Sequence, residues 1–187
     1  MSVLRTTFTQ ALAGAALVTA ALGATASTAV ADSVLLHDPA TDSAAGADIQ
    51  SVRVTHGTNL RVTVHHQNLV PSGRSNASGV VYVDTDPDRR GPELALSGGL
   101  MDGTDFALTR VRDWRRVGDQ LTCRHSVRMD FETDTSVFVV GRACLGADVD
   151  TARVAVRTGG NVRGDAADYD VDWLGGYHHL TGWVDRS

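Results

Sequence analysis

The residues best suited to chemistry form an acidic segment that follows an apolar run. Asp84, Asp86 and Asp88 occupy alternate positions, and Glu93 follows a Gly-Pro pair. Carboxylate oxygens at every second position can converge on a hard cation where the chain turns. The sequence therefore predicts a calcium site formed by Asp84, Asp86, Asp88 and Glu93.

An acidic turn without a metal is the alternative for this segment. Its glycine and glutamate stand at the eighth and tenth positions, whereas a helix-flanked calcium loop places them at the sixth and twelfth. Aspartate side chains also accept hydrogen bonds from nearby backbone amides, and Arg89 and Arg90 are available as ion-pair partners. Both interpretations stay open.

A second group of acids lies nearer the N-terminus. Asp38, Asp42 and Asp48 surround a proline and a glycine, as is typical of a solvated turn. We expect this group to join the first site only if the first strand pairs near residue 84.

Catalytic motifs are absent from the sequence. There is no Gly-x-Ser-x-Gly elbow, no zinc-protease helix and no lysine for a Ser-x-x-Lys motif. The paired histidines, His65-His66 and His178-His179, would point to opposite faces of a strand, and so could not share a metal without a bulge. This pattern favours a protein that is not an enzyme. Plentiful acids leave a small carboxylate-dependent hydrolase as an alternative.

The tryptophans are candidate ligand platforms. Trp114 lies between Asp113 and Arg115 in an expected hairpin loop, where an exposed indole can stack on a sugar ring. A core position is the alternative for Trp114, and we expect Trp173 and Trp183 in the core. Trp114 is thus the predicted ligand-binding residue.

The N-terminal segment predicts export. Residues 1–31 comprise a short basic start, an uncharged run rich in small apolar residues, and Ala29-Val30-Ala31 before Asp32. This is the pattern of a cleaved signal peptide, with cleavage near Ala31. We expect residues 32–187 to form a single secreted domain without a membrane span, because no later segment is apolar enough.

Cys123 and Cys144 are the only cysteines. In an exported chain, an even pair most simply forms a disulfide, here closing a loop of about 20 residues. A thiol nucleophile or a metal pair are the alternatives. The formal net charge of −5 and the interspersed signs argue against a nucleic-acid partner, which needs a concentrated basic face.

Short alternating runs predict an all-β fold. Residues 49–56 and 60–65 alternate around a Gly-containing break, which predicts a hairpin, and residues 79–83 predict a strand covered on both faces. Further strands are expected near residues 106–111, 121–127, 137–140 and 154–156, with a turn at Gly98-Gly99 and a long loop over 158–169. This spacing favours one antiparallel, jelly-roll-like β-sandwich.

Several segments also carry a family resemblance, namely residues 38–40, 47–49, 83–86, 91–93, 142–146 and 183–184. Over residues 34–184 the chain resembles small secreted proteins common in actinobacteria. Its first half is similar to family-nine carbohydrate-binding modules and DOMON-like domains. The resemblance implies a jelly-roll-like sandwich with structural calcium that binds a sugar or haem.

These observations together predict a secreted, calcium-stabilised β-sandwich that binds an extracellular ligand or a cell-surface glycan. The alternative, from a different class of function, is an interaction protein of the cell envelope or extracellular matrix. In that case the edges of its sheets would meet other protein chains.

Overall fold

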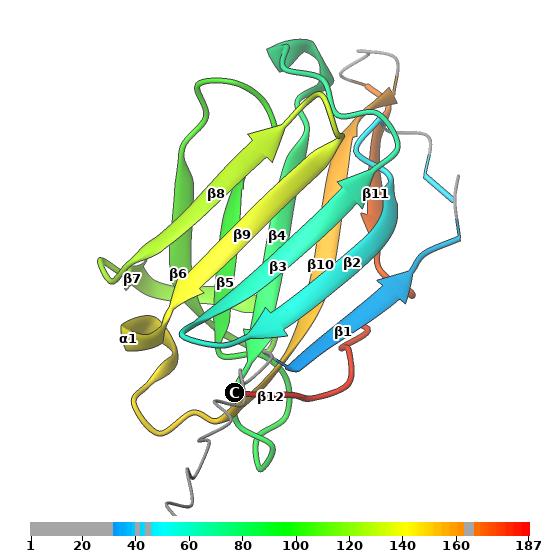
Figure 1. Ribbon diagram of the computed structural model, residues 1–187. Coiled ribbons are helices and arrows are strands. Elements are labelled where there is room, and N and C mark those ends of the chain that lie inside the picture. Colours follow the sequence, from blue (N-terminus) through cyan, green and yellow to red (C-terminus); the bar gives the residue numbers. More distant parts are fainter. Residues whose placement is uncertain (1–31, 40–41, 44–45, 163–166) are drawn as a thin grey trace, which may run out of the picture.

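Two antiparallel sheets pack face to face in the computed structural model, which describes residues 32–39, 42–43, 46–162 and 167–187 (Figure 1). The predicted signal peptide lies outside these residues. The first sheet has the order β1-β2-β3-β9-β8. Its strands span, in that order, Asp32–His37, Ile49–His56, Asn59–His66, Thr135–Gly141 and His125–Asp130.

The second sheet has the order β11-β10-β4-β5-β6-β7, and β12 also pairs with β10. Its strands span, in that order, Tyr169–Trp173, Thr151–Asn161, Ser78–Asp84, Leu94–Gly99, Phe106–Arg112 and Arg115–Gln120, with β12 at Val184–Asp185. The described helices are the short turns η1 (Gly73–Ser75) and α1 (Arg142–Leu145). No helix among the described residues is long and apolar enough to cross a membrane.

Alternation along the strands determines which side chains enter the core. In the β2–β3 hairpin, Val52 pairs with Val64 and Val54 with Val62, and all four are buried. Successive residues of a strand point to opposite faces, so each alternating run supplies one buried row. Phe138 of β9 fills the space between the sheets. The predicted hairpin is confirmed.

Two of the connections between the sheets lie at opposite ends of the sandwich. The chain passes from β3 to β4 and later from β9 to β10, and β9 pairs with β3 while β10 pairs with β4. Because β9 runs antiparallel to β3, the first crossing leaves the His66 end of β3 and the second leaves the opposite end, at Gly141 of β9 (Figure 1). The predicted antiparallel sandwich is confirmed.

The disulfide is confirmed as well. Cys123 precedes β8 and Cys144 lies in α1, with 5.5 Å between their Cα atoms. The bond joins the segment that enters the β8–β9 hairpin to the segment that leaves it.

Three expected elements are wrong. Gly98 and Gly99 end β5 instead of forming a turn, since both pair with residues of β4. The close approach of Thr104, whose Cγ2 would lie 2.5 Å from a Cβ at Gly99, explains the glycine there. Residues 158–161 continue β10, since β11 pairs with them and supplies the hydrogen bonds that a loop would lack. Residues 121–124 precede β8 as irregular chain leading into the disulfide.

The adjacent histidines of β3, His65 and His66, point to opposite faces of the sheet, as the alternation of a strand requires. His65 is exposed, whereas His66 is buried and hydrogen-bonded through Nδ1 to Ala47 O (3.1 Å) and through Nε2 to Ser136 Oγ (2.7 Å). Burial lowers the pKa of His66 to about 4 and outweighs the hydrogen bond to Ala47 and the charges of Asp134 and Asp48, which oppose this shift.

Removing the disulfide should destabilise the fold. The cysteines are 21 residues apart, and closing a loop of that size restricts the unfolded chain by about 3 kcal/mol. We expect Cys123→Ala/Cys144→Ala to lower the free energy of unfolding in urea by this amount. Reducing the wild-type protein should give the same loss. An unchanged urea midpoint in the double variant would contradict this role.

Acid should destabilise the protein through His66. Its pKa lies below the ordinary value of 6.5 in the folded state, so the unfolded chain binds the proton first as pH falls. The neutral, buried His66 therefore contributes about 3 kcal/mol to the free energy of unfolding above pH 6.5. This contribution is lost progressively as the pH falls from 6.5 to about 4. We expect His66→Gln to flatten the pH dependence of the free energy of unfolding over this interval.

The exposed neighbour provides the control for this titration. We expect His65→Gln to keep the wild-type slope, because this exposed substitution leaves His66 and its two hydrogen bonds in place. Parallel profiles for the wild type and His66→Gln would show that other groups, such as the buried His56, govern acid unfolding.

Candidate functional site

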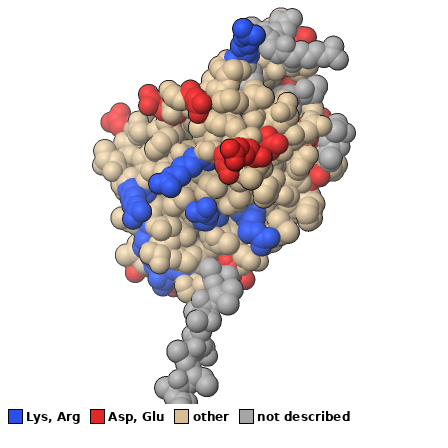
Figure 2. Space-filling view, turned by 45° about the horizontal axis from the view of Figure 1, so that its top comes forward, with Lys and Arg blue, Asp and Glu red and all other residues tan. Residues whose placement is uncertain are grey.

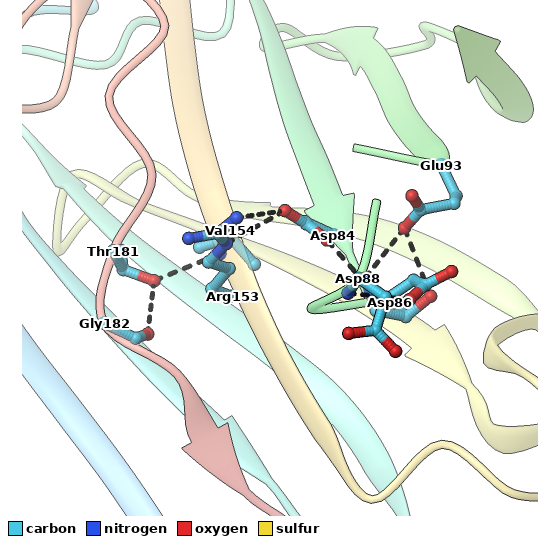
Figure 3. A network of polar contacts seen from close by, with 9 residues as sticks. Asp84, Asp86, Asp88, Glu93, Arg153, Val154, Thr181 and Gly182 are labelled. Atoms are coloured by element: carbon cyan, nitrogen blue, oxygen red, sulfur yellow. Dashed lines mark hydrogen bonds and ion pairs between the residues drawn. The ribbon is translucent and has the colours of Figure 1, made fainter. Parts of the chain in front are cut away.

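The acidic loop, residues 84–93, begins at a buried ion pair. Asp84 ends β4 fully buried, and Arg153 of β10 reaches its Oδ2 with Nη2 (2.8 Å) and Nε (2.9 Å). The two residues are cross-strand partners in the sheet register. Figure 3 shows the Arg153 side chain turned toward Asp84 while the other acids lie beyond it. One of the four predicted calcium ligands is therefore neutralised by arginine.

Two of the remaining acids, Asp86 and Glu93, bind the backbone of the loop itself. Asp86 Oδ1 accepts the Asp88 amide (3.0 Å), and Glu93 Oε2 accepts the Thr85 amide (2.8 Å). These contacts are those of the acidic-turn alternative. Glu93 Oε1 is buried without a hydrogen-bond partner. Calcium binding at this loop stays a prediction, because an ion would have to displace these donors or bind beside them.

A second set of acids forms a tighter group, which we call the acid cluster: Asp38, Asp42 and Asp172. Each contributes one carboxylate oxygen, and these oxygens lie within 4.8 Å of one another. It is the group among the described residues whose spacing could hold a metal ion. Asp38 and Asp42 belong to the β1–β2 loop, whereas Asp172 lies on β11 of the other sheet.

Two of these carboxylates are buried and anchored to backbone amides. Asp172 Oδ2 accepts the Ile49 amide at 2.6 Å, and Asp38 Oδ1 accepts the Gly175 amide at 2.7 Å. Asp38 is 7% exposed and Asp172 is 4% exposed, while Asp42 is open to solvent. The cluster therefore bridges the two sheets and has one solvent-facing side.

The electrostatics of the cluster favour an added positive charge. Burial raises the pKa of Asp172 to about 7; the Ile49 amide opposes this shift, and Asp42, Asp38 and Asp48 add to it. Burial also raises the pKa of Asp38, and the Gly175 amide opposes it. The charged neighbours that act on both groups are acids. Either a proton or a cation must offset this repulsion.

The sequence pattern indicates two of the three cluster residues, Asp38 and Asp42. It marked Asp38, Asp42 and Asp48, but expected them to meet residue 84 if the first strand paired there. That condition is not met, because β1 pairs with β2. The missed partner lies on β11, where Asp170 and Asp172 share a face. Alternate aspartates at 168, 170 and 172 repeat the spacing of the acidic loop and could have revealed it.

Trp114 belongs to an aromatic platform, formed by Tyr82, Trp114, Trp173, Tyr177 and His178. The indole stacks on the His178 ring with 4.0 Å between centroids and 4° between planes, and Tyr177 stacks on His178 at 3.8 Å. Tyr82 meets Trp114 edge-on at 5.1 Å. Trp114 is half-buried, so its exposure is intermediate between the two predicted alternatives, an exposed ligand platform and a core position.

The expectation that Trp173 and Trp183 fill the core is wrong. Trp173 stacks on Tyr82 (5.8 Å) on the outer face of the second sheet, and Trp183 lies beneath the Arg153 guanidinium. Both indoles are half-buried. Valine and leucine side chains fill the narrow space between the sheets, which leaves the indoles outside it.

The turns that carry the platform have left-handed backbone. Asp113 (φ 50°) and Trp114 (φ 64°) form the two-residue β6–β7 turn, with positive φ at both central positions as in type I′. His178 has φ 59°. A bulky side chain is rare in this region and needs packing to hold it there. The stacked rings supply that packing.

A groove runs beside the platform along the outer face of the second sheet. One section, of about 170 Å³, lies between Tyr82, Trp114 and Arg116. The adjoining section, of about 350 Å³, extends to Phe106 and Gln120. The two sections share Val80 and Ser97, and small side chains of β5 and β6 form their floor. We call this the aromatic groove.

The outer face of the first sheet carries a groove of different character, the arginine groove. It has a volume of about 350 Å³, with Arg61, Arg124 and Arg128 around a floor of Val137 and Val139. In the part of the chain that the structure describes, these three arginines make no side-chain hydrogen bond or ion pair. Figure 2 shows basic side chains spread across the middle of this side of the molecule.

Breaking the ion pair of the acidic loop should be costly. Arg153→Met leaves the buried Asp84 carboxylate without its partner, and we expect the free energy of unfolding to fall by about 3 kcal/mol. The double variant Asp84→Asn/Arg153→Met should recover much of this loss. Urea denaturation of the four proteins measures the coupling.

Arg157→Met is the matched control, because Arg157 lies on the same strand and forms no ion pair with a described residue. It should change stability little. Additive effects of the Asp84 and Arg153 substitutions would show that the pair does not organise the loop.

Comparisons with known proteins do not assign the chain to a family. No protein-family model matches it, and none of the curated proteins matches it. The geometry described above is therefore the basis for assigning its function.

Proposed function

We propose that the protein is an exported, non-enzymatic β-sandwich that binds a glycan in the aromatic groove. The observation that carries this proposal is Trp114, a half-buried indole fixed at the end of an open groove on a sheet face. Export is supported by the Cys123–Cys144 bond, since structural disulfides persist in oxidising compartments.

The groove offers both kinds of contact that a sugar chain requires. Pyranose rings present C–H faces that pack on aromatic rings, and Trp114, Tyr82 and Phe106 border the groove. Hydroxyl groups require donors and acceptors, and here Arg116 Nη2 lies 3.3 Å from Ser97 Oγ. Volumes of about 300–1,000 Å³ are usual for ligand sites, and the larger section of this groove falls in that range.

Preorganisation also supports binding by Trp114. The indole is held by His178 on one side and by the edge of Tyr82, while its own backbone is constrained in a two-residue turn. A side chain that is already ordered loses little conformational entropy when a ligand arrives. Burial lowers the pKa of His178, which favours the neutral form of the ring that stacks on Trp114.

The three arginines of the arginine groove favour a second candidate, binding of an anionic cell-envelope polymer on the opposite face. Arg61, Arg124 and Arg128 surround one groove although the chain has a formal net charge of −5. Guanidinium groups bind phosphate and carboxylate in bidentate fashion. Such binding would weaken as ionic strength rises, because exposed charges are screened.

One binding experiment tests both faces. The protein is incubated with a panel of neutral and anionic polysaccharides and cell-wall preparations, and calorimetry measures the affinity for each ligand found. We expect a neutral glycan to bind and Trp114→Ala to weaken it about tenfold or more, as loss of a central aromatic contact does. Circular dichroism checks that the variant is folded.

Arg61→Ala/Arg128→Ala is the matched control for Trp114→Ala. It should leave neutral-glycan binding unchanged if the aromatic groove is the site. Loss of binding in the arginine variant alone, together with strong salt dependence, would favour the second candidate. Absence of binding to every ligand of the panel would refute both.

A further inference from the structure

We propose that Asp38, Asp42 and Asp172 bind a calcium ion, which joins the β1–β2 loop of the first sheet to β11 of the second. This site differs from the acidic loop, and the proposal is independent of glycan binding. It rests on the positions of the three carboxylates and on one buried oxygen without a partner.

The spacing of the cluster fits a single ion of calcium's size. Calcium binds oxygens at 2.3–2.6 Å, so two ligands of one ion lie at most about 5 Å apart. The three carboxylate oxygens lie within 4.8 Å of one another. Asp38 and Asp172 approach from different sheets, which places the ion between them.

Asp38 supplies the independent observation. The residue is 7% exposed, its Oδ1 accepts the Gly175 amide, and its Oδ2 is buried without a hydrogen-bond partner. A buried carboxylate oxygen without a donor is destabilising unless something satisfies it. Because this oxygen belongs to the cluster's carboxylate, a bound cation would satisfy it directly.

The acid cluster is surrounded by further acids, whereas Asp84 of the acidic loop is paired with an arginine. Asp48 is fully buried nearby and accepts the Ser43 amide, and Ser43 Oγ donates to Asp170. These contacts hold further carboxylates close to the cluster and add negative charge. In contrast to the acidic loop, no ion pair of the described chain involves the three cluster residues.

The donor set selects a hard cation and favours calcium over other ions. All three side chains offer carboxylate oxygen, without the histidine or cysteine that zinc prefers. Asp42 is exposed, so water can complete an irregular coordination shell of six to eight oxygens and the ion has a route of entry. Magnesium requires a smaller, nearly octahedral arrangement.

Calorimetry and thermal unfolding of the oxidised protein test the proposal, with calcium chloride, magnesium chloride or EDTA at pH 7.5. We expect one calcium ion to bind. At 100 times its dissociation constant, calcium should raise the melting temperature by about 5–10 °C relative to EDTA. Magnesium should give a smaller shift.

Two cluster variants and one control locate the ion. Asp42→Asn removes an exposed ligand, and we expect it to weaken calcium binding at least about tenfold while the fold is retained. Asp172→Asn keeps an acceptor for the Ile49 amide but removes charge. In EDTA it should therefore melt at or above the wild-type temperature, with a much smaller response to calcium. Asp88→Asn, in the acidic loop, should respond as the wild type does.

Two results would overturn the proposal. One is a wild-type melting temperature that does not change with calcium. The other is a calcium response that survives in Asp42→Asn and Asp172→Asn but disappears in Asp88→Asn, which would place the ion in the acidic loop. Because neither readout depends on a glycan, a negative result with polysaccharides leaves this test unaffected.

Discussion

The hydrogen bond from the Ile49 amide to Asp172 Oδ2, at 2.6 Å, is the contact on which this edge of the sandwich depends. Ile49 begins β2 of the first sheet and Asp172 lies on β11 of the second. Thr158 Oγ1 donates to Ala47 O beside it, at 2.8 Å. Most of the core between the sheets consists of apolar side chains, which do not fix the relative position of the sheets in a directional way. The hydrogen bonds at this edge fix that position, but they also bring the carboxylates of the acid cluster together.

The same corner supports the aromatic platform. Asp38 binds the amide of Gly175, in the turn that presents Tyr177 and His178 to Trp114. Because Asp172 and Trp173 are adjacent on β11, one faces the acid cluster and the other faces the platform. We infer that a cation in the cluster also steadies the rings that border the aromatic groove. The proposed metal site and the proposed glycan site are then linked by one short strand and the turn after it.

Local patterns explain what the sequence could predict. Alternation in residues 49–65 predicted the hairpin, and the two cysteines predicted the disulfide, because both signals depend on near neighbours or on a single pairing. The acid cluster joins residues 38 and 172, whose proximity follows from how β10 and β11 pack beside the β1–β2 loop. Trp173 was expected in the core because large apolar residues usually lie there. Only the register of β11 with β10 shows that it faces outward.

Crystallography with anomalous scattering tests the central claim most directly. Crystals of the oxidised protein grown with calcium chloride would be measured at long wavelength, where calcium scatters anomalously. The account predicts one peak between the carboxylates of Asp38, Asp42 and Asp172, at 2.3–2.6 Å from their oxygens, including Asp38 Oδ2. A peak in the acidic loop with none in the cluster, or hydrogen-bonded carboxylates without a peak, would contradict it.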